Sequence, residues 1–497
     1  MRENEGRLNT PIDRRGFLAG TGAAGLSLLF GTGVSPLAGA AVRASGPPIR
    51  GQVIRRGAPG FLTVAHVYNQ RFDGWLPSLV ALPLDTTDVR NAVRWGVANG
   101  VPLRAKSGGH SYAGYSTLSG GMVLDLRNMR QISVNTRNRT ATISAGAQLI
   151  DVYAALAARG VTIPAGSCPS VGVAGHALGG GMGLAGRQFG LTADNLLSAQ
   201  IVTADGRVRT ASSTANPDLY WALRGGGGGN FGVVTSFTFR VHPVPRTVAA
   251  FFVSWPWSSA ADALAAWQAW APGARSELTS VFHLNGGGGS NSVNVSGQYF
   301  GPSGDLGRLL GPLRAVRGAR VSTGDYGYLQ AQMVWAGCSR ISLTACHTQG
   351  TRPGGTLQRE SFQAKSDYVA KPLPPAARQA LVQAAEARAQ IGGSGAILFD
   401  SYGGAINRVA PGATAFVHRN VLFCIQYLSY NGGGSWLSSV YSRMFPYVTG
   451  GAYFNYTDPD LRGWQTAYYG SNYRRLLEVR RAVDPHHYFN FPQAIGR

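Results

Sequence analysis

Apolar residues recur at helical spacing shortly after residue 85. Val89, Val93 and Val97 follow one another every four positions, which places them on one face of a helix. Thr86-Thr87-Asp88 supplies residue types that cap a helix at its start, and Asn99-Gly100 supplies a stop signal at its end. The pattern therefore predicts an amphipathic helix between residues 86 and 99.

The apolar pattern then changes to the period-two alternation of strands, interrupted by two short helical stretches. Asp205-Gly206 between two alternating segments is a hairpin signal. We therefore expect residues 45–245 to form an α+β domain. Its expected strands are Val101–Lys106, Met122–Leu126, Thr140–Ser144, Ser198–Val202, Arg207–Thr210 and Val233–Val241, and its further helices are Leu149–Ala158 and Leu219–Leu223.

Residues 246–450 have a different pattern, in which apolar strands and two long helical segments alternate. This pattern predicts a second domain, a sheet covered on one face by helices. The run Gly286–Gly289 is expected to be a hairpin or a loop, and the tail 451–497 is rich in aromatic residues. The expected strands are Val281–Leu284, Ser292–Tyr299 and Asn420–Tyr427, and the expected helices are Ala261–Trp270 and Ala376–Ala389.

Residues 1–44 are typical of a targeting segment rather than of the fold. Arg14-Arg15-Gly-Phe-Leu precedes an apolar Gly/Ala/Leu stretch, and Ala38-Gly39-Ala40 offers small residues for cleavage. We therefore expect a twin-arginine export signal and a secreted protein. An uncleaved membrane anchor is the alternative, but the many glycines suit a spanning helix poorly.

Composition describes a globular protein with a sizeable core, since 44% of the 497 residues are hydrophobic and 14% are charged. The formal net charge of +22 raises nucleic acid as a partner. However, the arginines are scattered singly or in pairs such as Arg55-Arg56. We therefore expect a solvated basic surface and no nucleic-acid partner.

Three glycine-rich segments carry candidate chemistry: 107–116, 164–190 and Gly225–Gly229. Bare backbone amides in such loops commonly bind diphosphates. A flexible linker is the alternative for 164–190, but apolar Val171, Val173 and Leu178 do not suit a solvated linker. The glycine spacing does not match the dinucleotide fingerprint with its flanking strand and helix, so a Rossmann fold is not indicated.

The four cysteines do not form a metal-binding pattern. There is no C-x-x-C and no His/Cys spacing that suits zinc, so we expect no metal. In an exported protein Cys338 and Cys346 could form a disulfide, and Cys424 in an apolar strand is most simply a buried thiol. Cys168 lies in the glycine loop instead. A cysteine protease would need a partner such as His110 or His176, and neither has an identifiable orienting group.

Four motifs together resemble the berberine-bridge-enzyme-like flavin oxidases of the vanillyl-alcohol-oxidase superfamily, from about residue 65 to the C-terminus. They are Ser107-Gly-Gly-His-Ser-Tyr, Gly166-Ser-Cys-Pro-Ser-Val-Gly-Val-Ala-Gly-His, Tyr453-Phe-Asn-Tyr-Thr-Asp and Asp484-Pro-His-His-Tyr-Phe-Asn-Phe-Pro-Gln-Ala-Ile. The resemblance implies a two-domain, PCMH-type FAD-binding fold. Residues 45–245 would form the FAD domain and 246–450 the substrate domain, and 451–497 would return to complete the FAD domain and the active site.

The resemblance also implies how FAD is held. His110 would be bonded to the flavin 8α-methyl group and Cys168 to C6, so that FAD is bound by two covalent bonds. His176 would lie by the ribityl chain and pyrimidine edge, where positive character stabilises the reduced ring; a structural histidine is the alternative. The other residues that the motifs place at the cofactor are Ser107, Gly108, Gly109, Ser111, Gly172, Val173, Gly175, Gly179, Gly180, Gly181, Asn490 and Gln493.

The same resemblance assigns the catalytic groups. Oxidation of an alcohol requires a base near the hydroxyl, with a lowered pKa. Tyr456 matches the family's catalytic tyrosine, and Tyr112 matches a tyrosine that hydrogen-bonds to it. Gln426 and Asp400 match strand positions that face the flavin. Tyr453, on the opposite side of the same expected strand, is the alternative base.

The expected function is a secreted, monomeric flavin oxidase that uses O₂ and releases H₂O₂. A doubly bonded flavin in an open site suggests a bulky substrate, foremost an oligosaccharide oxidised to its lactone. The alternatives are a tailoring oxidase of a glycosylated or polycyclic secondary metabolite, a flavin dehydrogenase, and a secreted polymer-binding protein on a degenerate oxidase fold. No integral membrane association is expected.

Overall fold

The computed structural model describes residues 46–287 and 290–497. The expected export signal at 1–44 lies outside the described residues. Within the described ranges no helix has the length and apolarity needed to cross a membrane. These ranges also contain no group of His, Cys, Asp and Glu side chains arranged to hold a metal ion.

The N-terminal part of the chain begins with a small sheet. Strands β2 (Leu79–Leu82), β4 (Met122–Asp125) and β3 (Leu103–Lys106) pair in parallel, and β1 (Gln52–Arg55) pairs antiparallel with β2. The predicted helix is α2 (Thr86–Ala98), but its cap is Asp85, whose carboxylate accepts the amide of Asp88. Val89 and Val93 are buried as expected, whereas Val97 is 44% exposed because the helix has turned it toward solvent.

A second, antiparallel sheet packs beside the first and contains the predicted hairpin. Its order is β5 (Ile132–Asn135), β6 (Thr140–Ser144), β10 (Val233–Arg240), β8 (Leu196–Val202) and β9 (Val208–Ser212). Strands β8 and β9 form the hairpin whose turn contains Asp205 and Gly206. Helices α3 (Leu149–Ala157) and α6 (Pro217–Ala222) belong to the same hydrophobic core, and β7 (Val161–Thr162) pairs with β11 (His242–Pro243).

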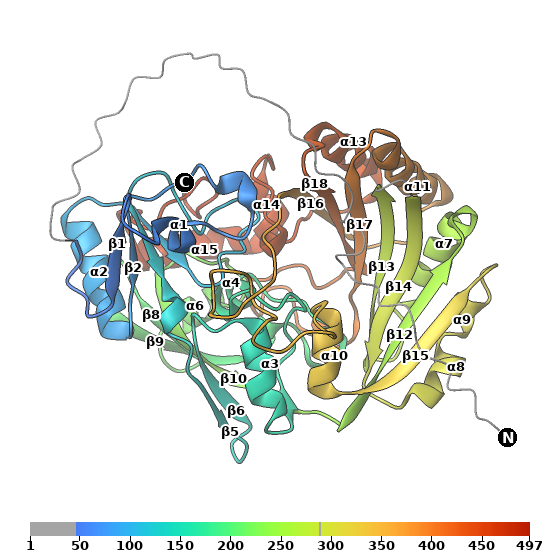
Figure 1. Cartoon of the computed structure of the whole chain (residues 1–497), viewed down its shortest axis with the longest axis horizontal. Helices are drawn as coiled ribbons and strands as arrows, with labels where there is room; N and C mark the ends of the chain where they lie inside the picture. Colours follow the sequence, from blue (N-terminus) through green and yellow to red (C-terminus); the bar gives the residue numbers. More distant parts are fainter. Residues whose placement is uncertain (1–45, 288–289) are drawn as a thin grey trace.

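The second half of the described chain is built on a large antiparallel sheet, which confirms the predicted layer of helices over one face of a sheet. Helices α7 (Ala260–Trp270), α11 (Pro375–Gln390) and α13 (Gly434–Met444) cover its outer face around the buried side chain of Trp267 (Figure 1). The strand order is β15 (Arg320–Gly327), β12 (Thr247–Trp255), β14 (Ser290–Tyr299), β13 (Leu278–Gly287), β17 (Ser394–Ser401), β18 (Phe423–Tyr430) and β16 (Phe362–Val369).

The glycine run after Leu284 forms a hairpin, as predicted. Gly287 at the end of β13 pairs with Ser290 at the start of β14, while residues 288 and 289 lie outside the described residues. The disulfide between Cys338 and Cys346, which the sequence left open, is present. It closes the loop after helix α10 (Tyr328–Trp335), and both cysteines are fully buried.

The C-terminal residues lie against the N-terminal half of the molecule. Helix α14 (Trp464–Tyr469) contributes Tyr469 to the core that holds α3 and the two N-terminal sheets, and helix α15 (Tyr473–Val483) contributes Leu476. The segment after α15 adds Ile495 to the same core. Figure 1 shows this red segment crossing back beside the blue N-terminal elements. The chain therefore forms the large sheet first and then returns to the N-terminal half of the molecule.

Buried ion pairs and hydrogen bonds join the half of the molecule that contains the large sheet to the N-terminal half and the C-terminal segment. Arg419 is fully buried, and its guanidinium donates to both carboxylate oxygens of Asp194, at 2.8 and 2.6 Å. The ammonium of Lys365 on β16 pairs with Asp458 of the C-terminal segment at 2.7 Å. Charge-assisted contacts of this kind have defined geometry, so they fix how the large sheet faces the N-terminal loops.

Candidate functional site

A cavity of ≈ 880 Å³ lies between the N-terminal glycine loops and the inner face of the large sheet. Its size is at the upper end of the range for small-molecule sites. Glycine loops, sheet side chains and the C-terminal segment all contribute to its wall. The predicted residues that line it are Ser107, Gly108, Gly109, His110, Ser111, Tyr112, Cys168, Gly172, Gly175, His176, Asp400, Gln426, Tyr456 and Asn490.

The loops 107–116 and 164–172 meet backbone to backbone at this cavity. A methyl group placed on Gly108 would lie 2.2 Å from the amide nitrogen of Gly172. A methyl group on Gly172 would lie 2.0 Å from Oγ of Ser107. Only glycine permits so close an approach. The two loops are thereby held in one fixed relation.

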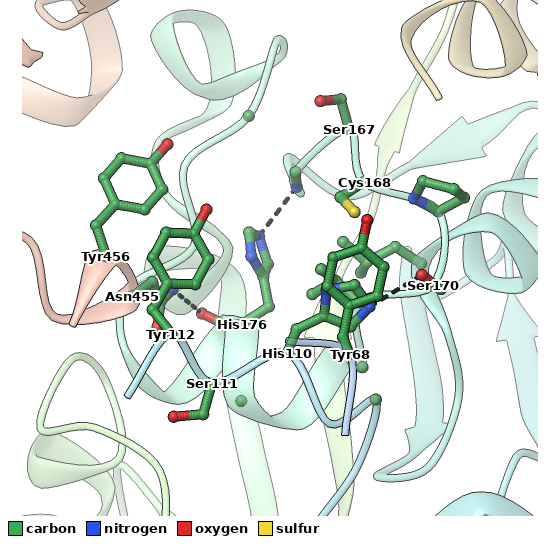
Figure 2. Close-up of a pocket in the computed structure, with 18 of the residues that line it drawn as sticks. Tyr68, His110, Ser111, Tyr112, Ser167, Cys168, Ser170, His176, Asn455 and Tyr456 are labelled. Atoms are coloured by element: carbon green, nitrogen blue, oxygen red, sulfur yellow. Dashed lines mark hydrogen bonds between the residues drawn. The ribbon is translucent and has the colours of Figure 1, made fainter. Parts of the chain in front are cut away.

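The second loop is also fixed to the start of helix α3. The amides of Leu149 and Ile150, which have no partner within the helix, donate to the carbonyls of Val171 (2.9 Å) and Pro169 (3.1 Å). Cys168 directly precedes Pro169 in this loop and is half-buried in the cavity wall. In Figure 2 its sulfur points toward the rings of Tyr68 and His110.

His110 is held by contacts on two sides. Its Nε2 lies 2.9 Å from Oγ of Ser170, and its ring stacks on Tyr68 with centroids 4.0 Å apart. Burial lowers the pKa of His110 to about 3, so the ring is neutral at pH 7. The sequence prediction places His110 and Cys168 at one ligand, and the structure brings both to the same part of the cavity (Figure 2).

His176 on helix α4 (Val173–Leu178) is neutral as well. The amide of Gly166 donates to Nε2 at 3.0 Å, so the ring proton is on Nδ1. Burial lowers the pKa of His176 to about 4. The protein alone therefore does not give the His176 ring the positive character that the resemblance implies. The preceding residue, Gly175, is exposed to the cavity, and a methyl group there would meet no atom within 4 Å.

The predicted catalytic residues form one connected group. The hydroxyl of Tyr456 donates to Asp400 on β17 at 2.9 Å, and the side-chain amide of Gln426 on β18 donates to the hydroxyl of Tyr112 at 2.8 Å. The two tyrosine rings stack with centroids 5.6 Å apart and an angle of 18° between their planes (Figure 2). The four residues come from three distant parts of the sequence.

The pKa of Tyr456 differs from the prediction of a lowered value. Burial, followed by the negative charge of Asp400, raises the pKa of Tyr456 well above its usual range. The phenol is therefore protonated and donates its hydrogen to Asp400.

The expected strand through Tyr453 and Tyr456 is wrong. Residues Phe454–Tyr456 form a short 3-10 turn, in which the side-chain amide of Asn455 donates to the carbonyl of His176 at 2.9 Å. Tyr453 is 2% exposed, and its hydroxyl accepts the amides of Gly181 and Met182, at 3.0 and 3.1 Å. Tyr453 thus fixes the glycine segment, and its hydroxyl is already engaged.

Several residues assigned to the cofactor do not line the cavity. A methyl group on Gly179 would lie 2.0 Å from the side-chain oxygen of Asn455, so this glycine serves internal packing. Val173 is fully buried in the core, and Gln493 is 3% exposed with its amide on the carbonyl of Asp458. The residues assigned to the cofactor that do not line the cavity are Val173, Gly179, Gly180, Gly181 and Gln493.

Two cavity residues were missed by the sequence analysis. Arg104 on β3 is mostly buried and has no ion-pair partner among the described residues, and burial lowers its pKa to about 10. The buried hydroxyl of Tyr115 has no hydrogen-bond partner in the same ranges. A charged residue on a buried strand directly before a glycine loop is the signal that could have identified Arg104. An unpaired cation, a free hydroxyl and a loop of bare amides fit an anionic, polyhydroxylated ligand such as FAD.

Comparisons with known proteins agree with this geometry. Residues 77–212 match the family model described as "FAD binding domain", and residues 452–496 match "Berberine and berberine like". The chain is 33% identical to the FAD-linked oxidoreductase YgaK of Bacillus subtilis (strain 168), with 90% of this chain and 97% of the relative covered.

Two further proteins are similar over most of their length. Xylooligosaccharide oxidase of Thermothelomyces thermophilus is 31% identical, with 89% of this chain and 92% of the relative covered. The solved structure of BBE-like 1 from Physcomitrella patens superposes with a TM-score of 0.83 at 34% identity, covering 90% of this chain and 97% of that one.

The contact between the two glycine loops leads to a prediction. Gly172→Ala should lower the flavin content of the purified protein several-fold and destabilise it by about 1–3 kcal/mol, because the added methyl group overpacks the contact with Ser107. Gly74→Ala is the matched control, since a methyl group there meets no atom within 4 Å. Absorbance per protein and thermal unfolding measure both effects. Equal flavin content and stability in the two variants would contradict the account.

Proposed function

Because the chain belongs to the berberine and berberine-like family of FAD-linked oxidoreductases, we propose that it is a secreted oxidase of a bulky alcohol or hemiacetal substrate. The foremost substrate is an oligosaccharide, oxidised at its terminal hemiacetal carbon to a lactone. FAD would be held covalently by His110 and Cys168, and O₂ would be reduced to H₂O₂. The observation that carries this proposal is the Tyr456–Asp400 pair in the wall of a cavity that also contains both anchor residues.

The residues present fit FAD. When bound, FAD would supply the redox chemistry, because it can accept hydride from carbon and pass electrons to O₂. His110 and Cys168 would hold the isoalloxazine end, and the amides of the 107–109 loop together with Arg104 would hold the diphosphate. Gly175 leaves open space on the cavity side of helix α4.

The proton of the substrate hydroxyl goes to the tyrosine–aspartate pair. Tyr456 already donates its hydrogen to Oδ2 of Asp400, so the phenolic oxygen keeps lone pairs that can accept the substrate proton. As it accepts that proton, its own can move to Asp400. The pair therefore acts as the base even though burial raises the pKa of Tyr456 itself. The stacked ring of Tyr112, held by Gln426, keeps Tyr456 in place.

The inner face of the large sheet supports a sugar substrate. His283 and Asn294 lie opposite each other on β13 and β14, Nε2 of His283 lies 3.0 Å from Oγ of Ser296, and Asn285 follows on the same face. Two strand spacings separate Asp400 from β14, or about 10 Å. Side-chain amides and hydroxyls over that length match the hydroxyl groups of more than one sugar ring, while Trp335 adds an aromatic surface to the same cavity.

A substrate screen tests this proposal. We expect H₂O₂ release with xylo-, cello- or chito-oligosaccharides and none with polycyclic aglycones. Asn294→Leu should raise KM at least about tenfold with kcat little changed, because it removes binding shared by ground state and transition state. Asn138→Leu, in the exposed β5–β6 turn, is the control. Turnover of the aglycones alone would favour a tailoring oxidase, and slow reoxidation in air would favour a dehydrogenase.

A second prediction concerns the proton acceptor. Tyr456→Phe and Asp400→Asn should retain bound flavin but slow its anaerobic reduction by substrate about 10²–10⁴-fold, the usual contribution of general base catalysis. Tyr447→Phe, at a 36% exposed position, should reduce at the wild-type rate. Stopped-flow absorbance measures the rate. Undiminished reduction in both active-site variants would remove the pair as the base.

We also propose export through the twin-arginine pathway and action as a monomer. Replacing both Arg14 and Arg15 by lysine should leave the protein in the cytoplasm, with flavin already bound, because this pathway reads the paired arginines. Arg7→Lys should be exported normally. Fractionation with flavin fluorescence measures the outcome, and normal export of the double variant would refute the proposal.

A further inference from the structure

The hydrogen bond between His110 and Ser170 connects the two anchor loops of the site. Nε2 of His110 lies 2.9 Å from Oγ of Ser170, and Ser170 is 2% exposed, two residues after Cys168. Stacking on Tyr68 fixes the plane of the imidazole ring. Nδ1 of His110 has no hydrogen-bond partner among the described residues. The ring therefore presents one occupied and one open nitrogen.

Covalent attachment of the ring requires a particular protonation state. The nitrogen that bonds to carbon must have its lone pair available, so in a neutral imidazole the proton must be on the other nitrogen. With Ser170 at Nε2, the ring is ready to bond at Nδ1 only when Nε2–H donates to the serine oxygen. Burial opposes a charged ring, so the Nε2 proton must leave as the new bond forms.

We propose that Ser170 is a positioning residue that prepares His110 for covalent attachment to the flavin. Its hydroxyl accepts Nε2–H before the bond forms, and it rotates to donate to Nε2 afterwards. A hydroxyl can do both, whereas a carbonyl could only accept and an amide nitrogen only donate. This inference rests on the proposed bicovalent FAD and adds the residue that makes one of the two bonds form.

The reaction balances with the components of the proposed function. A C–H bond of the 8α-methyl group and the N–H bond of His110 break, and a bond forms between Nδ1 and the 8α-carbon. The two electrons that are released enter the flavin and pass to O₂, which leaves with the two protons as H₂O₂. Ser170 relays the Nε2 proton to water in the cavity and is itself unchanged.

Cys168 provides an internal control, because it should bond to the same flavin without help from the Ser170 hydroxyl. In Ser170→Ala, peptide mass mapping should find flavin on the Cys168 peptide as in the wild type. Flavin on the His110 peptide should fall at least about tenfold. Ser170→Thr keeps a hydroxyl and should restore the His110 bond. In the alanine variant, the remaining attachment should accelerate as pH rises from 7 to 9, since hydroxide can take the proton in place of serine.

The outcomes separate this inference from the proposed function. Full His110 attachment in Ser170→Ala, or failure of Ser170→Thr to restore it while the Cys168 link persists, overturns the role of Ser170 and leaves the oxidase proposal intact. Loss of both links in Ser170→Ala also overturns it, because the Cys168 link should survive. Wild-type protein without flavin on His110 removes the bicovalent arrangement itself, and the inference with it.

Discussion

The backbone contact between two glycine loops is the constraint on which the rest of the site depends. Gly108 and Gly172 approach so closely that a methyl group on either would overlap the other loop. Carbonyls of the loop 164–172 also accept hydrogen bonds from the first amides of α3. The rigid helix therefore fixes the position of both loops. His110 and Cys168 thus face one cavity although 58 positions separate them in the sequence (168 − 110). Two covalent bonds to one ligand require that kind of fixed separation.

The opposite wall of the cavity depends on a different set of contacts. Strands β17 and β18 carry Asp400 and Gln426, and the returning C-terminal segment carries Tyr456. Buried pairs, Arg419 with Asp194 and Lys365 with Asp458, hold the sheet and that segment in place. The tyrosine–aspartate pair is therefore assembled only when the whole chain has folded. The chemistry at each wall follows from burial, which keeps His110 and His176 neutral and Tyr456 protonated.

Local patterns were sufficient to predict much of the fold. The period of Val89 and Val93 and the hairpin signal at Asp205 correspond to α2 and to the β8–β9 pair. The prediction of a strand at Tyr453 was wrong, because a tertiary hydrogen bond from the Asn455 side chain to helix α4 outweighs the local preference of the sequence for a strand.

The site could be predicted only through its motifs, and motifs do not separate cofactor contact from packing. A run of glycines such as Gly179 to Gly181 looks the same whether its space is filled by a ligand or by side chains such as Asn455. Arg104 was missed for the converse reason, since nothing local shows that its charge is buried without an ion-pair partner among the described residues. The pKa values of His176 and Tyr456 likewise depend on burial that only the folded chain establishes.

The most direct test of the account is a mass analysis of the denatured, proteolysed protein. If one FAD is bonded to both anchors, digestion should release a single species in which the peptide containing His110 and the peptide containing Cys168 are joined through one flavin. Its mass should equal the two peptides plus one FAD, less the hydrogens lost on bonding. Flavin released by acid precipitation, with both peptides recovered at their unmodified masses, would contradict the central claim.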